Sequence, residues 1–478
     1  MFNRRQFLGT SAAFAAPFIL TGCAAGRART FAANEKVNIG VVGIGRISTT
    51  MDMPLAAKYR DLCRITAVCD LDAKRLAHGV QFVKNIYKED PGYPVKTYAD
   101  YHDLLADPSI DAVEICIPDH WPALVACAAL AAGKHIWLQK PFAQTITEGR
   151  LIANLAKMRN RVVQVGSWQR SVEQFHRVCE LVRNGRIGEI KRVEVGIGLD
   201  KAGGSSAVEP VPANLNYDMW LGPTDEKAPY NWTRVHQQDL RRIADRPGWI
   251  QMAPYGWGMI TNWGAHHLDI ARWGLGALGA EGVSGTCEWM DLSGGKLWNV
   301  HTTYDLHFKF NGGKTDVHVC NKYQNGVKFI GEKGDWLWCT RDAERVTPSD
   351  PFPKAKPGEL PPIAASRPEL MPKMKPMYVR SQQIHVNNWL DAVAANDPTM
   401  TVTNAEGGHR STSLCSLGQM CMELGRGKKD FSLDWDAAKE STGNAEADRL
   451  MKPLANGKFD LNVNLAEFGL TFDDVVRT

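Results

Sequence analysis

Val37-Asn-Ile-Gly-Val-Val-Gly43-Ile-Gly45-Arg-Ile-Ser48 is the stretch of sequence that decides the fold. Its apolar, β-branched first half, 37–42, is typical of a strand buried on both faces of a parallel sheet. Gly43 and Gly45 permit a sharp turn and let a pyrophosphate approach the backbone N–H groups at the start of a helix. Ser48 replaces the third glycine of this fingerprint and is small enough for close helix–strand packing. Taken alone, the motif predicts either a dinucleotide-binding turn or a plain tight turn.

Asp70 decides between these two interpretations. A second apolar run, 64–70, ends at this acid, about 20 residues after the glycine motif. A carboxylate at this position binds the ribose hydroxyls of the adenosine and repels a 2′-phosphate. The sequence therefore predicts a bound dinucleotide and favours NAD over NADP.

The rest of the chain indicates two α/β domains. Apolar runs at 112–117 and 135–138 alternate with helical segments, which predicts a doubly wound Rossmann domain over residues 36–160. Residues 161–455 predict a substrate-binding and oligomerisation α/β domain with a largely antiparallel open sheet. They are followed by a C-terminal tail, 456–478. The predicted strands of the second domain are 161–166, 190–198, 299–310, 314–322 and 326–331, and its predicted helices are 172–183, 382–395 and 413–425.

Turn residues at 311–313 and 324–326 predict two hairpins in the second domain. Residues 348–376, rich in proline and lysine, predict a long irregular excursion. We also expect the open sheet to have an apolar outer face through which the chain forms a homo-oligomer, a dimer or tetramer.

The charge is concentrated at the N-terminus. Lys and Arg number 56 against 52 Asp and Glu, and residues 1–29 hold four arginines and no acid, so residues 30–478 are formally neutral. Because residues 30–478 carry no net charge, the sequence argues against a nucleic-acid-binding protein, which needs a basic face. Outside the leader the cysteines include no CxxC pair, which favours buried free thiols and predicts no metal site.

The leader has the pattern of an export signal. Arg4-Arg5 is followed by Gln6, by two hydrophobic residues and by an apolar stretch too short for a bilayer span. The order of these residues resembles a twin-arginine signal, and Leu20-Thr-Gly-Cys23 resembles a lipoprotein cleavage box, in which Cys23 would be lipidated. The alternative is a frayed helix with chance arginines. We expect a periplasmic or membrane-anchored protein, because this route exports folded proteins with their cofactor already bound.

A set of motifs, in this order, resembles the glucose–fructose oxidoreductase, inositol dehydrogenase and MocA-like proteins (Gfo/Idh/MocA) over about residues 36–455. The motifs are Gly43-Ile-Gly45, Cys69-Asp70, Ile117-Pro118-Asp119-His120-Trp121, Ala132-Gly-Lys-His135, Lys140-Pro141, Asn262-Trp-Gly-Ala-His266-His267-Leu-Asp269 and Glu406-Gly-Gly-His409-Arg410. The glycine motif and the resemblance together place the cofactor contacts at Gly43, Ile44, Gly45, Arg46, Ile47, Asp70, Pro118, His120, Gln139 and Lys140.

The resemblance also implies the catalytic residues. Lys140 matches the lysine of the family's Glu-Lys-Pro motif, which lies between nicotinamide and substrate, whereas Gln139 replaces the glutamate. His266 matches the histidine of the family's Asp-x-x-x-His motif and is the expected general acid/base, whereas Asn262 replaces the aspartate and cannot titrate. Asp269, three residues after His266, is placed either to orient the histidine or on the helix surface. The alternatives are a solvated loop lysine and a structural histidine.

Candidate substrate contacts come from aromatic and polar residues near this motif. Indole faces stack on the apolar faces of sugars, so Trp257 and Trp263, which flank the predicted site, are the first candidates among the tryptophans. Gln169 and Arg170 resemble positions that line the family's pocket, and His267 adjoins His266.

Three functions follow as alternatives. The first is an exported NAD-dependent oxidoreductase acting on a sugar, sugar derivative or cyclitol with tightly held cofactor. The second is a glycoside hydrolase or lyase that oxidises a ring carbon transiently and reduces it again. The third is a catalytically weak NAD- and sugar-binding protein, for which Ser48, Gln139 and Asn262 are the evidence.

Overall fold

The computed structural model describes residues 35–224, 227–343, 345–349, 382–428, 430–457 and 459–476. The predictions for the leader, with Arg4, Arg5 and Cys23, lie outside the described residues, as does most of the predicted excursion at 348–376. Among the described helices, none is both long and apolar enough to cross a membrane.

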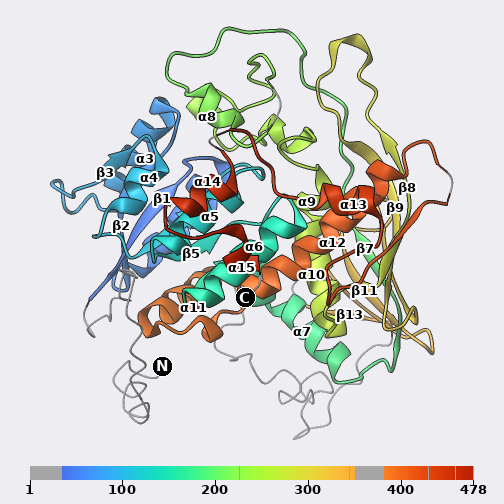
Figure 1. Ribbon diagram of the computed structural model, residues 1–478. Coiled ribbons are helices and arrows are strands. Elements are labelled where there is room, and N and C mark those ends of the chain that lie inside the picture. Colours follow the sequence, from blue (N-terminus) through green and yellow to red (C-terminus); the bar gives the residue numbers. More distant parts are fainter. Residues whose placement is uncertain are drawn as a thin grey trace, which may run out of the picture.

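The first sheet is parallel throughout and lies on the left in Figure 1. Its strands are flanked by helices on both faces, which confirms the predicted Rossmann-like fold. Along the sheet the strands are β3 (Lys96–Tyr98), β2 (Cys63–Cys69), β1 (Val37–Val42), β4 (Ala112–Ile115), β5 (His135–Leu138) and β6 (Val163–Val165). The flanking helices are α2 (Met53–Ala56), α3 (Ala73–Ile86), α4 (Tyr101–Ala106), α5 (Pro122–Ala131) and α6 (Ile146–Met158).

Several segments outside 36–160 complete this first layer. Strand β6 pairs with β5, and α11 (Gln382–Ala395) packs beside β1 and α2. The predicted tail is folded, since α14 (Leu461–Ala466) packs against α5 and α15 (Phe472–Val476) against α6. Helix α5 is apolar on all sides because α6, α14 and the sheet surround it, and its residues 122–130 are buried.

The second sheet is mixed and mostly antiparallel, as predicted, and lies on the right in Figure 1. In spatial order its strands are β13 (Thr347–Pro348), β12 (Trp336–Cys339), β11 (Gly326–Gly331), β7 (Ile190–Gly196), β10 (Thr315–Cys320), β9 (His301–Phe310), β8 (Gly282–Trp289) and β14 (Ser432–Asp434). Helices α7 (Glu173–Arg183), α10 (Gly264–Leu275) and α12 (Ala405–Leu424) pack against it. The remaining helices are α8 (Tyr217–Leu221), α9 (Met259–Asn262) and α13 (Ala445–Leu450).

Two local predictions for the second domain differ from the structure. The turn at 311–313 joins the hairpin β9–β10, but β10 and β11 do not pair, because β7 lies between them, parallel to β10 and antiparallel to β11. Helix α12 begins eight residues before the predicted start. Its Gly408 lies within the helix and packs so closely that a Cβ there would lie 2.6 Å from Val165 Cγ2.

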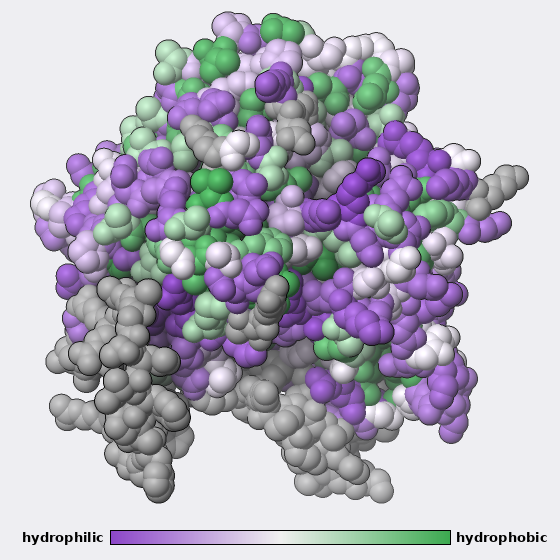
Figure 2. Space-filling view, in the orientation of Figure 1, coloured by the Kyte–Doolittle hydropathy of each residue, from purple (hydrophilic) through white to green (hydrophobic). Residues whose placement is uncertain are grey.

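The outer face of the second sheet is mixed, because half-buried Ile330, Trp336 and Trp338 lie there beside charged side chains. Alternate residues of its strands point into the core, and several polar side chains on the other face contact one another across strands. Lys328 Nζ lies 3.7 Å from a Glu194 carboxylate oxygen, and His307 Nδ1 lies 3.0 Å from one of Asp316. Figure 2 shows the molecule from the side on which helices α10, α12 and α13 lie in front of this sheet, and hydrophilic residues predominate there.

Candidate functional site

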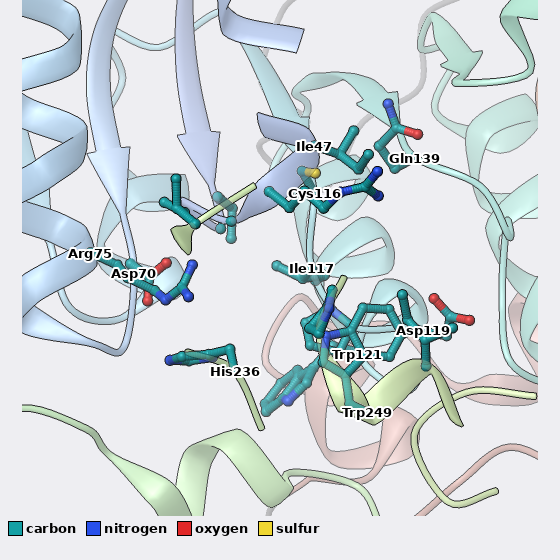
Figure 3. Close-up of a pocket in the computed structure, with 18 of the residues that line it drawn as sticks. Ile47, Asp70, Arg75, Cys116, Ile117, Asp119, Trp121, Gln139, His236 and Trp249 are labelled. Atoms are coloured by element: carbon teal, nitrogen blue, oxygen red, sulfur yellow. The ribbon is translucent and has the colours of Figure 1, made fainter. Parts of the chain in front are cut away.

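A cavity of about 270 Å³ opens at the carboxyl ends of the parallel strands. It lies where the strand order reverses between β1 and β4, which is where doubly wound sheets bind their ligands. Figure 3 shows Asp70 and Arg75 on one side of the cavity and Asp119, Trp121 and Trp249 on the other. The same cavity continues to Lys140, Asn262 and His266, so the predicted cofactor and catalytic residues share one space.

The two glycines of the turn serve different purposes. Gly43 has φ 91°, and a Cβ there would lie 2.3 Å from the carbonyl oxygen of Cys116, so the fold itself requires glycine. A Cβ at Gly45 would meet no protein atom within 4 Å, and Gly45 lines the cavity with Arg46 and Ile47. The room beside Gly45 is therefore available to a ligand. Ile44 does not line the cavity, because its side chain is buried against Gly79.

Asp70 is fixed at the end of β2 by backbone donors. Its carboxylate accepts hydrogen bonds from the N–H groups of Ile44, at 2.7 Å, and Asp72, at 2.8 Å. Burial raises the pKa of Asp70, and the charge of Arg75 opposes this. Arg75, which sequence reasoning missed, donates to the carbonyls of Ile44 at 3.2 Å and Gln237 at 3.0 Å.

Residues 236–250, here named the covering segment, lie across this end of the cavity. Gln237, Ile243 and Trp249 of this segment line the cavity. Asp72 anchors it to the Rossmann layer through two of its side chains, with distances of 3.0 Å to Gln238 Nε2 and 3.1 Å to His236 Nε2. Asn214, which precedes the segment, donates to Asp72 at 2.7 Å and to Gln238 Oε1 at 3.1 Å and so supports the same anchor. Arg46 Nε also donates to the Ala244 carbonyl at 2.9 Å. This anchoring could not be predicted from the sequence, because its contacts join residues more than 100 positions apart.

Lys140 lies at the other end of the cavity. Its Nζ donates a hydrogen bond to the backbone carbonyl of Asn262 at 2.9 Å. Burial lowers the pKa of Lys140 to about 8, and the negative charge of Asp119 opposes this change. A lysine with such a pKa exchanges protons near neutrality, which suits a general acid/base.

Gln139 lines the cavity next to a buried acid. Its Nε2 is 2.8 Å from both carboxylate oxygens of Asp52, and burial raises the pKa of Asp52 to about 7. A carboxyl group is therefore present one side chain further from the cavity than the family's glutamate would be. This partner was not predicted, since Asp52 lies outside every motif.

Replacing Gln139 by glutamate is expected to destabilise the protein, because two carboxyl groups would then meet where the amide now donates. We expect a loss of about 2–3 kcal/mol at pH 8. The loss should shrink at pH 5, where one of the two groups holds a proton. Thermal denaturation at the two pH values measures this. The second change Asp52→Asn should recover most of the stability, and equal losses with and without it would contradict the pairing.

His266 is a neutral imidazole in this cavity. Burial lowers the pKa of His266 well below its usual value, and the charge of Lys140 adds to this. Its ring lies parallel to that of Trp168, with centroids 6.1 Å apart, and its Nδ1 has no hydrogen-bond partner among the described residues. Asp269 does not orient it and is not on the surface either: its carboxylate is buried and accepts two hydrogen bonds from Arg170, at 2.6 and 2.7 Å.

Of the predicted substrate contacts, Gln169 and Trp263 line the cavity. Gln169 is 2% exposed, and neither polar atom of its carboxamide has a hydrogen-bond partner in the described part of the chain. Arg170 is bound to Asp269 and lies outside the lining.

Three further predicted contacts also lie outside the lining. His267 is bonded through Nδ1 to the Gly196 carbonyl, and Trp257 packs against the core of the second domain. Pro118 lines the cavity, but His120 is buried behind it and bonded to the Trp220 carbonyl.

Asp119 is the main functional candidate that sequence reasoning missed. It is 7% exposed, lines the cavity and lies in the loop after β4. Its position in a motif at the carboxyl end of a parallel strand was the available signal. Arg341, whose guanidinium lies 5.6 Å from the Trp263 ring centroid, also lines the cavity and was not predicted.

Two family models match the chain. Residues 37–167 match the oxidoreductase family with an NAD-binding Rossmann fold, and residues 201–287 match the C-terminal α/β domain of the same family. A glycosyl hydrolase family 109 protein of Saccharopolyspora erythraea is 26% identical over 205 residues, covering 40% of this chain and 44% of that protein. The inositol 2-dehydrogenase of Salmonella typhimurium is 32% identical over 151 residues, covering 31% and 42%.

The chain thus spans less than half the length of these relatives. Solved structures share the fold over a larger part of the chain. The WlbA dehydrogenase of Chromobacterium violaceum, solved with NADH and UDP-GlcNAcA, has a TM-score of 0.59 at 16% identity, covering 85% of this chain and 99% of that one. In both of its domains the chain is therefore similar to the Gfo/Idh/MocA oxidoreductase family.

Proposed function

We propose that the protein is an exported NAD-dependent oxidoreductase that acts on a hydroxyl group of a sugar, sugar derivative or cyclitol and holds its cofactor tightly. One observation carries the proposal: a single cavity joins the dinucleotide-binding turn and Asp70 to Lys140, Asn262 and His266. Bound NAD would accept a hydride from the ring carbon. Gly45, Arg46 and Asp70 line this cavity and would hold it.

Side chains of the protein transfer the proton of the substrate hydroxyl. Lys140 in its neutral form accepts the proton as the hydroxyl becomes a carbonyl, and the Asn262 carbonyl fixes the position of its Nζ. His266, held neutral by burial, is placed to donate to or accept from the same oxygen. Trp168 and Trp263 offer aromatic faces to a sugar ring, and Gln169 offers an unpaired carboxamide to its hydroxyls.

Asp70 and Arg75 support NAD over NADP. The Asp70 carboxylate faces the ribose end of the cavity and would repel a 2′-phosphate. Arg75 is an alternative phosphate-binding group, but its Nη1 and Nη2 already donate to two backbone carbonyls.

The covering segment supports tight cofactor binding. Asn214 and Gln238 help to anchor it and do not line the cavity, so changing both to alanine weakens the anchor alone. We expect dissociation of NAD to become about 10–100-fold faster, because two hydrogen bonds to a carboxylate are lost. Stopped-flow displacement measures the rate. Gln81→Ala with Asn85→Ala, an exposed Gln–Asn pair, is the matched control, and equal rates in both variants would contradict the role.

The leader supports export. Twin-arginine transport carries folded proteins, so NAD can be bound in the cytoplasm, and Cys23 is a candidate for a lipid anchor. Replacing Arg4 and Arg5 by lysine should retain the protein in the cytoplasm when cells are fractionated. Unchanged distribution would argue against this route.

The name of the Saccharopolyspora relative supports the second candidate, a redox-assisted glycoside hydrolase or lyase. Such a cycle oxidises a ring carbon, eliminates the aglycone, adds water and reduces the carbon again, with no net redox change. Incubating the protein and its bound NAD with free sugars, myo-inositol and aryl glycosides separates the two. A stable rise in absorbance at 340 nm with a free sugar or cyclitol supports the oxidoreductase, and aryl alcohol release without added acceptor supports the hydrolase. If neither signal is observed, only a binding function remains.

A further inference from the structure

We propose that Asp305, His307 and His318 bind one divalent transition-metal ion, best matched by Zn²⁺, on the outer face of the second sheet. Each side chain offers one ligand atom, and these atoms all lie within 4.8 Å of one another. None of the three residues lines the cavity described above, so the proposal does not depend on the proposed function.

The pairing of two strands brings these residues together. β9 and β10 are antiparallel, and His307 lies directly opposite His318. Asp305 precedes His307 by two residues, so both side chains leave β9 on the same face. That face is the outer one, because Leu306 and Val317 point into the core. The sequence predicts no metal site because the ligands are divided between two strands and no short motif marks them.

Ring nitrogens of both histidines converge on one carboxylate oxygen. Asp305 Oδ1 lies 2.5 Å from His318 Nε2 and 3.4 Å from His307 Nε2, and the two imidazole rings are stacked with centroids 4.0 Å apart. In a tetrahedral site with zinc–ligand distances of about 2.0–2.1 Å, the ligand atoms lie about 3.3–3.4 Å apart. The separation of Asp305 from His307 already matches this value. The separation of Asp305 from His318 requires only a small movement of a half-exposed carboxylate.

A second carboxylate orients His307 as a ligand. Asp316 lies on β10, and its carboxylate oxygens are 3.0 and 3.1 Å from His307 Nδ1. When Nδ1–H donates to this carboxylate, the lone pair of Nε2 is left on the side of Asp305. Metal-bound histidines commonly have such a carboxylate partner, which fixes the ring and raises the basicity of the ligand nitrogen.

Tyr323 permits the same arrangement at His318. Its hydroxyl oxygen lies 2.6 Å from His318 Nδ1 and can accept the Nδ1 proton, which leaves Nε2 to the metal. Arg192 Nη2 also lies 2.6 Å from this nitrogen, and it donates to the Tyr323 hydroxyl as well. When the metal binds, the guanidinium therefore keeps only its bond to Tyr323. The positive charge of Arg192 opposes the ion, and the two carboxylates of Asp305 and Asp316 outweigh it.

The ligand atoms determine which ion fits. Two imidazole nitrogens and one carboxylate oxygen suit Zn²⁺, whereas Ca²⁺ and Mg²⁺ prefer oxygen ligands. Three protein ligands leave one position of a tetrahedral ion to water. The side chains of His307 and Asp305 are 42% and 46% exposed, so an ion reaches them from solvent. An ion bound here would join β9 to β10.

Titration with Co²⁺ tests the site. This ion occupies zinc sites and absorbs strongly in the visible range only when it is four- or five-coordinate. The untagged full chain, treated with EDTA, should bind one Co²⁺ per chain with this absorption, and Zn²⁺ should abolish it. Asp316→Ala keeps all three ligands but removes the partner of His307 Nδ1, so Co²⁺ affinity should fall about 10–100-fold. His307→Ala and Asp305→Ala, which each remove a ligand, should weaken binding further.

His102→Ala is the matched control. His102 is 38% exposed, similar to His307, and its Nδ1 lies 2.7 Å from a carboxylate oxygen of Asp100. This variant should bind Co²⁺ as the unchanged protein does. Absence of the visible absorption, or equal binding by His307→Ala and the control, would overturn the proposal. Thermal unfolding checks that the variants are folded, and because no step uses NAD or a sugar, the result is separate from that of the proposed function.

Discussion

Replacing Lys140 by methionine is expected to lower kcat by about 10²–10⁴-fold, the usual contribution of a general acid/base. Methionine retains the length of the side chain but cannot accept the hydroxyl proton. Bound NAD should be retained, because Lys140 Nζ bonds to the Asn262 carbonyl and not to the glycine turn. Turnover of bound NAD with the sugar or cyclitol found in the 340 nm screen measures the loss.

The pH dependence of the oxidation rate is a second test of the role of Lys140. Only the neutral amine accepts a proton, so oxidation by the unchanged protein should become faster as the pH rises through about 8, the pKa of Lys140. The Lys140→Met variant should lack this limb. Lys74→Met, on the exposed surface of α3, is the control and should keep both the rate and the limb. A Lys140→Met variant with most of its activity would assign the proton to His266 alone.

Alanine at Gly43 and at Gly45 is expected to separate folding from cofactor binding. Gly43→Ala forces a side chain onto a backbone with φ 91° and against the Cys116 carbonyl, so we expect a loss of about 3 kcal/mol or more in the free energy of unfolding. Gly45→Ala adds a methyl group that meets no protein atom within 4 Å. The stability of its apoprotein should change by no more than about 0.5 kcal/mol.

In contrast to its stability, the NAD affinity of the Gly45→Ala variant should change. Its methyl group enters the cavity where the pyrophosphate would approach the backbone, and we expect NAD affinity to fall by about tenfold or more. Denaturant unfolding of the apoprotein and calorimetric titration with NAD measure the two quantities. Normal NAD affinity in folded Gly45→Ala would place the cofactor elsewhere.

The Rossmann layer could be predicted from the sequence because its evidence is local. The apolar run 37–42, the two glycines and the acid at 70 report on backbone and burial within a short segment, and β1 has the predicted bounds. The turn at 311–313 was predicted for the same reason. The pairing of β10 with β11 was not, because the intervening β7 comes from more than 100 residues earlier in the chain.

The candidate site was harder to predict because its partners are distant in sequence. Arg170 was expected in the pocket, but Asp269 binds it from 99 positions away, and no local pattern marks that pair. The anchoring of the covering segment by Asp72 and the contact of Gln139 with Asp52 are of the same kind. Asp119 was within a recognised motif, but only the folded chain shows that it lines the same cavity as Lys140.

The nucleotide content of the purified protein tests the central claim most directly. Acid denaturation should release close to one NAD per chain, identified by mass spectrometry, and the stripped protein should bind NAD again at one site per chain. Gly45→Ala should carry less nucleotide than the unchanged protein. A folded protein that is isolated free of nucleotide and shows no affinity for NAD would contradict the account.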